Sequence, residues 1–170
     1  MSLTMATIAK DSAAQMFTAL DGLLQKGADH ARAGGVDDAV YLGWRLAPDM
    51  FSLDQQIRIA TELPARALSR LAGVEPPDYG RDETTFEEMR ERVARARAHV
   101  AGLPEDALAA DPDAPITFPA GGGAEMTLAR RVYLQSFILP NLYFHVTAAY
   151  VILRRLGVDL GKRDFLAVPA

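Results

Sequence analysis

The sequence predicts an all-α protein, a four-helix bundle that spans residues 1–170 as a single domain. Three observations support this prediction. Apolar residues recur at helical spacing in four long stretches, a glycine closes each stretch, and a serine or threonine capping box opens two of them. Amphipathic helices of this length bury their apolar faces against one another. The expected helices cover residues 8–33, 52–73, 85–101 and 128–157.

The first helix is defined by Met16, Leu20 and Leu23, which share one face at helical spacing. A short helical turn is expected after it, over residues 38–45, with Asp37 as its N-terminal cap.

Capping boxes mark where the second and third helices begin. In SLDQ, Ser52 caps the backbone and Gln55 reaches back to it, which leaves Gln56 on the inward face. In TFEE, Thr85 is the cap and Glu88 its partner.

The third helix carries a run of basic residues at positions 90–99, and glutamates precede its arginines by about one turn. Such pairs are typical of a solvated helix face, and we also expect His99 to lie on the surface. The expected pairs are Glu87 with Arg90, Glu88 with Arg92, and Glu91 with Arg95.

The segment from residue 103 to residue 128 is the least helical part of the chain. Its strings ITF and EMT flank PAGGGA, a pattern typical of a small hairpin, although this much glycine also suits a flexible loop. We therefore expect a short hairpin or loop insertion before the last helix.

The last helix carries two polar side chains within an apolar face. Leu134 and Ile138 begin this face, and Asn141 and His145 follow on it one turn apart. Pro140 has no N–H to donate to the carbonyl four residues earlier, so we expect a kink or a polar substitute there.

Composition excludes several classes of function. The chain has 170 residues, of which 49% are apolar and 24% charged, and its net charge of −4 argues against nucleic acid or an anionic membrane as partner. It contains 0 cysteines, which excludes disulfides and a cysteine nucleophile. We find neither a signal peptide nor 18 consecutive apolar residues, and expect a cytoplasmic protein.

Three strings together resemble an uncharacterised branch of the DinB/YfiT-like four-helix bundles. They are RLAPDMF at residues 45–51, FHVTAAYVILRRLG at residues 144–157, and GKRDFL at residues 161–166. The resemblance implies an up-down-down-up order of helices, in which the connector of about 12 residues after Gly73 crosses over. Such a connector spans up to roughly 40 Å, enough for a helix of about 30 Å, but up-down-up-down is equally permitted by its length.

In the last helix of that superfamily, an H-x-x-x-H motif precedes LRxxG. When the motif is aligned on Leu153 and Gly157, its second histidine falls on His145 and its first on Asn141. The resemblance implies a divalent metal, zinc or nickel, held by three histidines with one open position for water or a thiol. Residues 53–62 contain no histidine, so we expect no conventional three-histidine site, and His145 is the metal ligand candidate that remains.

Under the crossover order, one end of the bundle gathers a candidate polar cluster. Three interpretations stay open. The side chains bond one another and fix helix register, they orient a small ligand in an apolar pocket, or His145 with Asp49 and either Gln56 or His30 forms a variant metal site. The cluster consists of His145, Asn141, Gln56, Asp49 and His30.

We predict an uncharacterised DinB-like bundle protein that binds a small molecule or a partner through this cluster, and we assign no catalytic residue. The alternative is a divergent metal-dependent hydrolase or transferase with His145 as the surviving ligand. Apolar stripes on two faces of the last helix exceed what one core requires and predict a homodimer.

Two contacts are expected outside the cluster. The tail should bury Phe165 and Leu166 along the bundle, because an unpacked tail would scarcely carry both. Arg45 should pair with Asp49 or Asp164 as a structural clamp.

Overall fold

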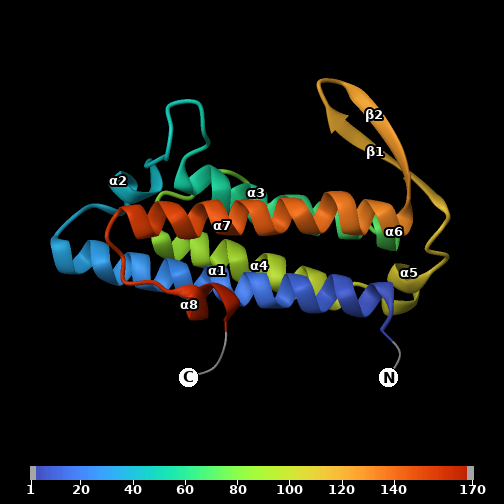
Figure 1. Ribbon diagram of the computed structural model, residues 1–170, viewed down its shortest axis with the longest axis horizontal. Coiled ribbons are helices and arrows are strands. Elements are labelled where there is room, and N and C mark those ends of the chain that lie inside the picture. The colour runs from blue at the N-terminus through green and yellow to red at the C-terminus, as the bar shows by residue number, and fades with distance from the viewer. Residues whose placement is uncertain (1–2, 168–170) are drawn as a thin grey trace.

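The computed structural model describes residues 3–167, and Figure 1 shows its long helices lying side by side. The mostly helical prediction is confirmed, and the segment before the last helix is a two-stranded hairpin. The helix α6, the π-helical turn η1 and the helix α7 form one continuous rod. The elements are α1 (Met5–Gly34), α2 (Asp38–Leu42), α3 (Leu53–Ala72), α4 (Phe86–Gly102), α5 (Glu105–Ala109), β1 (Pro115–Gly121), β2 (Ala124–Ala129), α6 (Arg130–Tyr133), η1 (Leu134–Ile138), α7 (Leu139–Arg155) and α8 (Lys162–Leu166).

The long helices pack so that α1 and α3 each contact both α4 and α7. In Figure 1, α1 and α7 run from right to left, whereas α3 and α4 run from left to right. Contacts at the two ends of the bundle agree with these helix directions. Near the start of α4, the backbone N–H of Phe86 donates to Asp38 of α2 at 2.9 Å. At the other end, Arg130 donates to the carbonyls of Leu71 and Ala107 at 2.9 and 2.6 Å. The segment between α3 and α4 therefore crosses the length of the bundle.

Arg92 of α4 fixes this crossover segment. Its side chain is 0% exposed and donates to the Glu83 carboxylate at 2.6 Å, to the Gly80 carbonyl at 2.9 Å, and to Thr61 of α3 at 2.9 Å. Arg58 of α3 holds Glu83 from the other side at 3.1 Å. Burial alone would raise the pKa of Glu83, but hydrogen bonds from the two arginines bring the pKa below its ordinary value. The carboxylate stays ionised and ties the segment to both helices.

The prediction that Arg92 pairs with Glu88 on a solvated helix face is wrong. Glu88 instead turns back to the start of α4 and accepts the backbone N–H of Thr85 at 3.0 Å, as the capping box requires. Arg95 likewise reaches Glu83, at 3.9 Å, and not the expected glutamate. The crossover segment covers this face of α4, and helical spacing alone does not show such coverage.

The ends of the helices follow the predicted capping chemistry with one exception. Gln55 accepts the backbone N–H of Ser52 at 3.2 Å at the start of α3. Gly35 and Gly73 close α1 and α3 in the left-handed conformation, with φ of 65° and 67°. The helix α4 differs, because its cap is Leu103 in an extended conformation.

The hairpin has one buried side chain that joins it to the bundle. Phe118 of β1 lies opposite Met126 of β2, and two glycines with positive φ, residues 122–123, form the turn. Phe118 is 1% exposed, and its ring centroid lies 4.1 Å from that of Tyr133 and 4.8 Å from that of Phe137. The hairpin therefore packs over the first turns of the last helical rod, and its tip projects away from the bundle (Figure 1).

The proline of the last rod is accommodated by a π-helical turn. The N–H of Leu139 donates to the carbonyl of Leu134, five residues earlier, just before Pro140. A polar substitute was expected at the carbonyl of Ser136, but the side-chain amide of Asn141 donates instead to the neighbouring carbonyl of Phe137, at 2.7 Å.

The whole rod, Arg130–Arg155, is long and apolar enough to cross a membrane by length and composition alone. Of its most apolar window, 44% is buried inside the bundle. The core helix of a packed bundle passes the same test, so this composition does not assign the rod to a membrane.

The C-terminal tail returns to the bundle as predicted, but Phe165 and Leu166 are half-buried rather than buried. Phe165 of α8 packs against the core, with its ring 6.0 Å from that of Tyr150. Asp164 pairs with Lys26 of α1 at 2.7 Å, and the hydrogen bond from Lys26 lowers the pKa of Asp164. The expected pair of Asp164 with Arg45 is therefore not formed, and Arg45 is exposed.

Candidate functional site

His145 of α7 and Gln56 of α3 meet inside the bundle, as the two apolar faces predict. Their side chains are 7% and 1% exposed, and the imidazole Nδ1 lies 2.7 Å from the amide Oε1. The amide nitrogen of Gln56 donates to the carbonyl of Phe51 at 3.3 Å, which orients the amide. Because Oε1 only accepts, Nδ1 must carry the proton and Nε2 presents a lone pair.

Burial also sets the charge of this imidazole. Removing His145 from water disfavours its cationic form and lowers its pKa below the ordinary value. At neutral pH the ring is therefore uncharged, with Nδ1 as a donor and Nε2 as an acceptor.

The other three residues expected in the cluster do not join this pair. Asn141 turns its amide to the carbonyl of Phe137, one helical turn back along the same rod. His30 lies against Gly157, where its Nε2 would be 3.5 Å from an added Cβ. That glycine is 12 residues beyond His145, about 18 Å along the helix. Asp49 is exposed on the loop before α3. The five-residue cluster is thus reduced to two.

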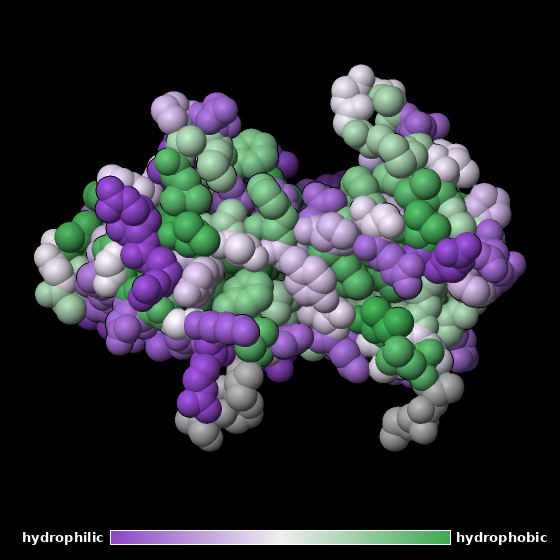
Figure 2. All heavy atoms as spheres, in the orientation of Figure 1, coloured by the Kyte–Doolittle hydropathy of each residue, from purple (hydrophilic) through white to green (hydrophobic). Residues whose placement is uncertain are grey.

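One aromatic side chain contacts His145, and two others are exposed on the loop before α3. Phe144, which is 60% exposed, stands edge-on to the imidazole with ring centroids 5.2 Å apart. Phe51 and Trp44 on the loop before α3 are 49% and 42% exposed. Figure 2 shows apolar atoms over this loop and the adjoining part of α7. Exposed apolar side chains therefore lie beside the pair on α7 and on the loop before α3.

These residues do not fit a three-histidine metal centre. Within residues 3–167, no three His, Cys, Asp or Glu side chains come together as a possible ligand set. His145 supplies one free imidazole nitrogen, and its neighbour Gln56 supplies an amide, a poor ligand for zinc or nickel.

His99 was expected on the surface and is instead half-buried. Its Nε2 lies 2.6 Å from the hydroxyl of Ser69 in α3, and burial lowers the pKa of His99. Ser69 is 0% exposed, so this pair links α3 to α4 and does not present a nucleophile to solvent.

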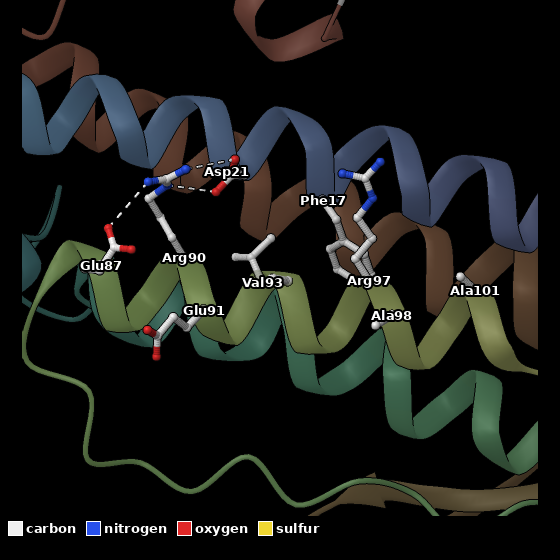
Figure 3. A pocket seen from close by; sticks show the side chains of 10 residues that line it. Phe17, Asp21, Glu87, Arg90, Glu91, Val93, Arg97, Ala98 and Ala101 are labelled. Carbon is white, nitrogen blue, oxygen red and sulfur yellow. Dashed lines mark hydrogen bonds and ion pairs between the residues drawn. The ribbon is translucent and has the colours of Figure 1, made fainter.

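A groove of about 520 Å³ runs along α1 and α4 (Figure 3). Arg90 of α4 pairs with Asp21 of α1 at 2.8 Å and with Glu87, as expected, at 3.5 Å. Phe17 and Val93 contribute apolar lining between the helices. Arg90 is therefore already paired, whereas Glu91 and Arg97, which also line this groove, form no ion pair among residues 3–167.

A second groove, of about 420 Å³, lies between α3, the π-turn and the hairpin. The sequence analysis did not predict this groove. The available signal was Arg66 and Arg70, which lie four residues apart on α3 and therefore share one face of the helix. Tyr133 and Phe137 of the last rod also line this groove.

The packing of the long helices with a short hairpin is that of a DinB-like helical bundle. The chain is similar to the crystal structure of a DinB family member protein from Shewanella denitrificans, with a TM-score of 0.85 and 31% sequence identity over 96% of this chain and 94% of that one. It belongs to the family described as Domain of unknown function (DUF1993), whose model matches residues 5–166. No curated protein matches the chain.

Proposed function

We propose that this member of the DUF1993 family binds a small molecule at the His145 end of the bundle, without a three-histidine metal site. The observation that carries the proposal is the Nε2 atom of His145. It has no hydrogen-bond partner within residues 3–167, in a neutral ring that Gln56 holds in place. We also assign the long helices to the up-down-down-up order, because α3 and α4 begin at the same end.

The chemistry around Nε2 indicates the kind of ligand. A fixed acceptor that is not among the fully buried unpartnered atoms is open to a ligand, and it favours a molecule that donates an O–H or N–H. The exposed rings of Phe144 and Phe51 favour an apolar body on the same molecule. A small aromatic alcohol or amine satisfies both requirements.

Phenol and anisole form a matched pair of probes, because the two differ in the O–H donor. We expect phenol to bind saturably in a calorimetric or NMR titration and anisole to bind more weakly. His145→Phe should abolish phenol binding, whereas His99→Phe, which also removes a half-buried imidazole, should retain it. Equal affinity of the wild-type protein for phenol and anisole would by itself contradict the proposal.

A divergent metal-dependent hydrolase or transferase, with His145 as the surviving ligand, is the competing function. Elemental analysis of protein purified without a chelator or a histidine tag separates the two. Stoichiometric zinc or nickel in the wild type that is lost in His145→Ala would favour the enzyme and count against our proposal.

We further propose a cytoplasmic homodimer that uses the exposed face of α7. Phe144 is 60% and Val151 39% exposed on that helix, more apolar surface than a monomer usually presents. Light scattering after gel filtration should show a dimer that Phe144→Glu converts to a monomer. Thr18→Glu, at an exposed position on α1, should leave the dimer unchanged, and a monomeric wild type would exclude the proposal.

A further inference from the structure

The second groove lies at the far end of α3 from His145. Gln56 and Arg70 are 14 residues apart on this helix, which separates the two sites by about 21 Å. Three arginines and one glutamate line the groove, although the whole chain carries a net charge of −4. A local excess of positive charge on an acidic protein is a feature that a binding site for an anion requires.

Arg70 is the arginine of this groove that lacks an acidic partner. Glu62 is the lining carboxylate, and it is held by Arg66 at 2.7 Å, by Arg92 at 3.5 Å and by Arg81 at 3.9 Å. Among residues 3–167, Arg70 forms no ion pair, and its Nη1 donates to the hydroxyl of Tyr133 at 3.0 Å. Its other guanidinium N–H groups therefore remain available to a ligand.

Tyr133 supplies a second donor at the same place. It is 1% exposed, and burial raises the pKa of its phenol, so the hydroxyl keeps its proton at neutral pH. Because the oxygen already accepts from Arg70, the phenolic O–H remains free to donate. A guanidinium and a hydroxyl that touch each other thus offer hydrogen bonds to one small acceptor.

The wall beside these donors is aromatic. The rings of Tyr133 and Phe137 stack with centroids 5.4 Å apart and an interplanar angle of 22°. They are four residues apart across the start of the π-turn, and Phe118 of the hairpin packs behind both. Ile59 and Leu63 of α3 complete an apolar lining.

We propose that this groove binds a small aromatic carboxylate, with its anionic group on Arg70 and Tyr133 and its ring against Phe137. The unpaired arginine selects the charge, because a carboxylate matches the planar fork of a guanidinium. The aromatic wall selects the body of the ligand. Inorganic phosphate carries the negative charge but has no aromatic body, so it should bind more weakly.

Isothermal titration of the full chain with 2-naphthoate tests this proposal. We expect saturable binding below about 10 mM, the range of weak ligands of this size. Neutral methyl 2-naphthoate, which has no O–H or N–H to donate to His145, tests the contribution of charge, and inorganic phosphate tests that of the ring. Affinity for either should be lower by about tenfold or more, the effect of losing one charge-assisted contact or one buried ring.

Variants of two neighbouring arginines provide the matched control. Arg70→Met should weaken naphthoate binding about tenfold or more, and Arg70→Lys should restore part of the affinity. Arg66→Met removes an arginine of the same groove that Glu62 already neutralises, so its effect should be less than about threefold. Thermal unfolding of each variant checks that the fold is intact.

Three results would overturn the proposal. They are the absence of saturable naphthoate binding to the wild type, equal affinity for the neutral methyl ester, and unchanged affinity in a folded Arg70→Met protein. Equal affinity for phosphate would assign the groove to any small anion and contradict the aromatic part. His145→Phe should leave naphthoate binding unchanged, so the two proposed sites can fail independently.

Discussion

Replacing Arg92 with methionine tests whether buried ion pairs hold the crossover segment on the bundle. Methionine keeps much of the apolar stem but cannot donate the hydrogen bonds to Glu83 at 2.6 Å and Thr61 at 2.9 Å. Glu83, whose side chain is 7% exposed, would retain Arg58 as its close partner, at 3.1 Å.

The expected cost follows from this geometry. Removing one partner of a buried ion pair costs about 3–5 kcal/mol, because the remaining charge is left without compensation. Arg58 still compensates part of the charge on Glu83, so we expect a value near the lower bound, about 3 kcal/mol of unfolding free energy. For a chain of this length, that loss lowers the Tm by roughly 6–12 °C.

Urea unfolding followed by circular dichroism measures the loss. Arg97→Met is the control, because Arg97 is exposed on the same helix and should change stability by less than about 0.5 kcal/mol. Adding Glu83→Leu to Arg92→Met removes the uncompensated carboxylate, and Arg58 keeps Asp54 at 2.7 Å. The double variant should be more stable than Arg92→Met alone. An Arg92→Met protein as stable as the control would refute the reasoning.

Three further predictions concern pH, helix packing and the hairpin. Burial lowers the pKa of His145 and His99 in the folded protein below the ordinary histidine value of 6.5. Their contribution to folding stability is therefore complete above pH 6.5, and it is lost as the pH falls through the lowered pKa of the folded state. Unfolding free energy should therefore decrease from pH 7 to about pH 5, and His145→Gln should flatten this slope; an unchanged slope would count against a buried neutral ring. An added Cβ at Gly27 would lie 3.0 Å from Leu153 and 3.1 Å from Phe86, whereas nothing lies within 4 Å at Gly22 on the same helix. Gly27→Ala should lose about 1 kcal/mol, and Gly22→Ala should gain about 0.5–1 kcal/mol in the same denaturation assay. Phe118→Ala should cost about 3–5 kcal/mol by removing a ring that is 1% exposed, while Met126→Ala, at the opposite hairpin position and 44% exposed, should cost less than about 1 kcal/mol. Similar Tm values for the two hairpin variants would show that the hairpin is not fixed through Phe118.

Local chemistry in the sequence was enough to predict the long helices and the hairpin, but not the short helices α5 and α8. The caps at Ser52 and Thr85 depend on side chains within three residues of the backbone they bond. The hairpin and the disturbance at Pro140 are local in the same sense. The contact of His145 with Gln56 was also within reach, because each polar residue interrupts an otherwise apolar helix face and such faces must meet in a core.

Contacts between segments far apart in the chain were decided by the tertiary structure alone. Arg92 has the sequence surroundings of a solvated residue, and it is buried because the crossover segment covers it. His30 and His145 share a helical bundle, yet the register of α1 against α7 places His30 beside Gly157.

By itself, then, the sequence determined which long stretches become helices and where α3 and α4 begin, since these depend on neighbours within one or two turns. The tertiary structure decided which charges are buried and which polar residues meet. The groove at Arg70 depends on the tertiary structure, because the Tyr133 hydroxyl meets the Arg70 guanidinium only through the alignment of α3 with the last helical rod. Arg70 and Tyr133 are 63 residues apart in the chain. Their contact depends on how whole helices pack against one another, and the residue spacing within either helix does not predict it.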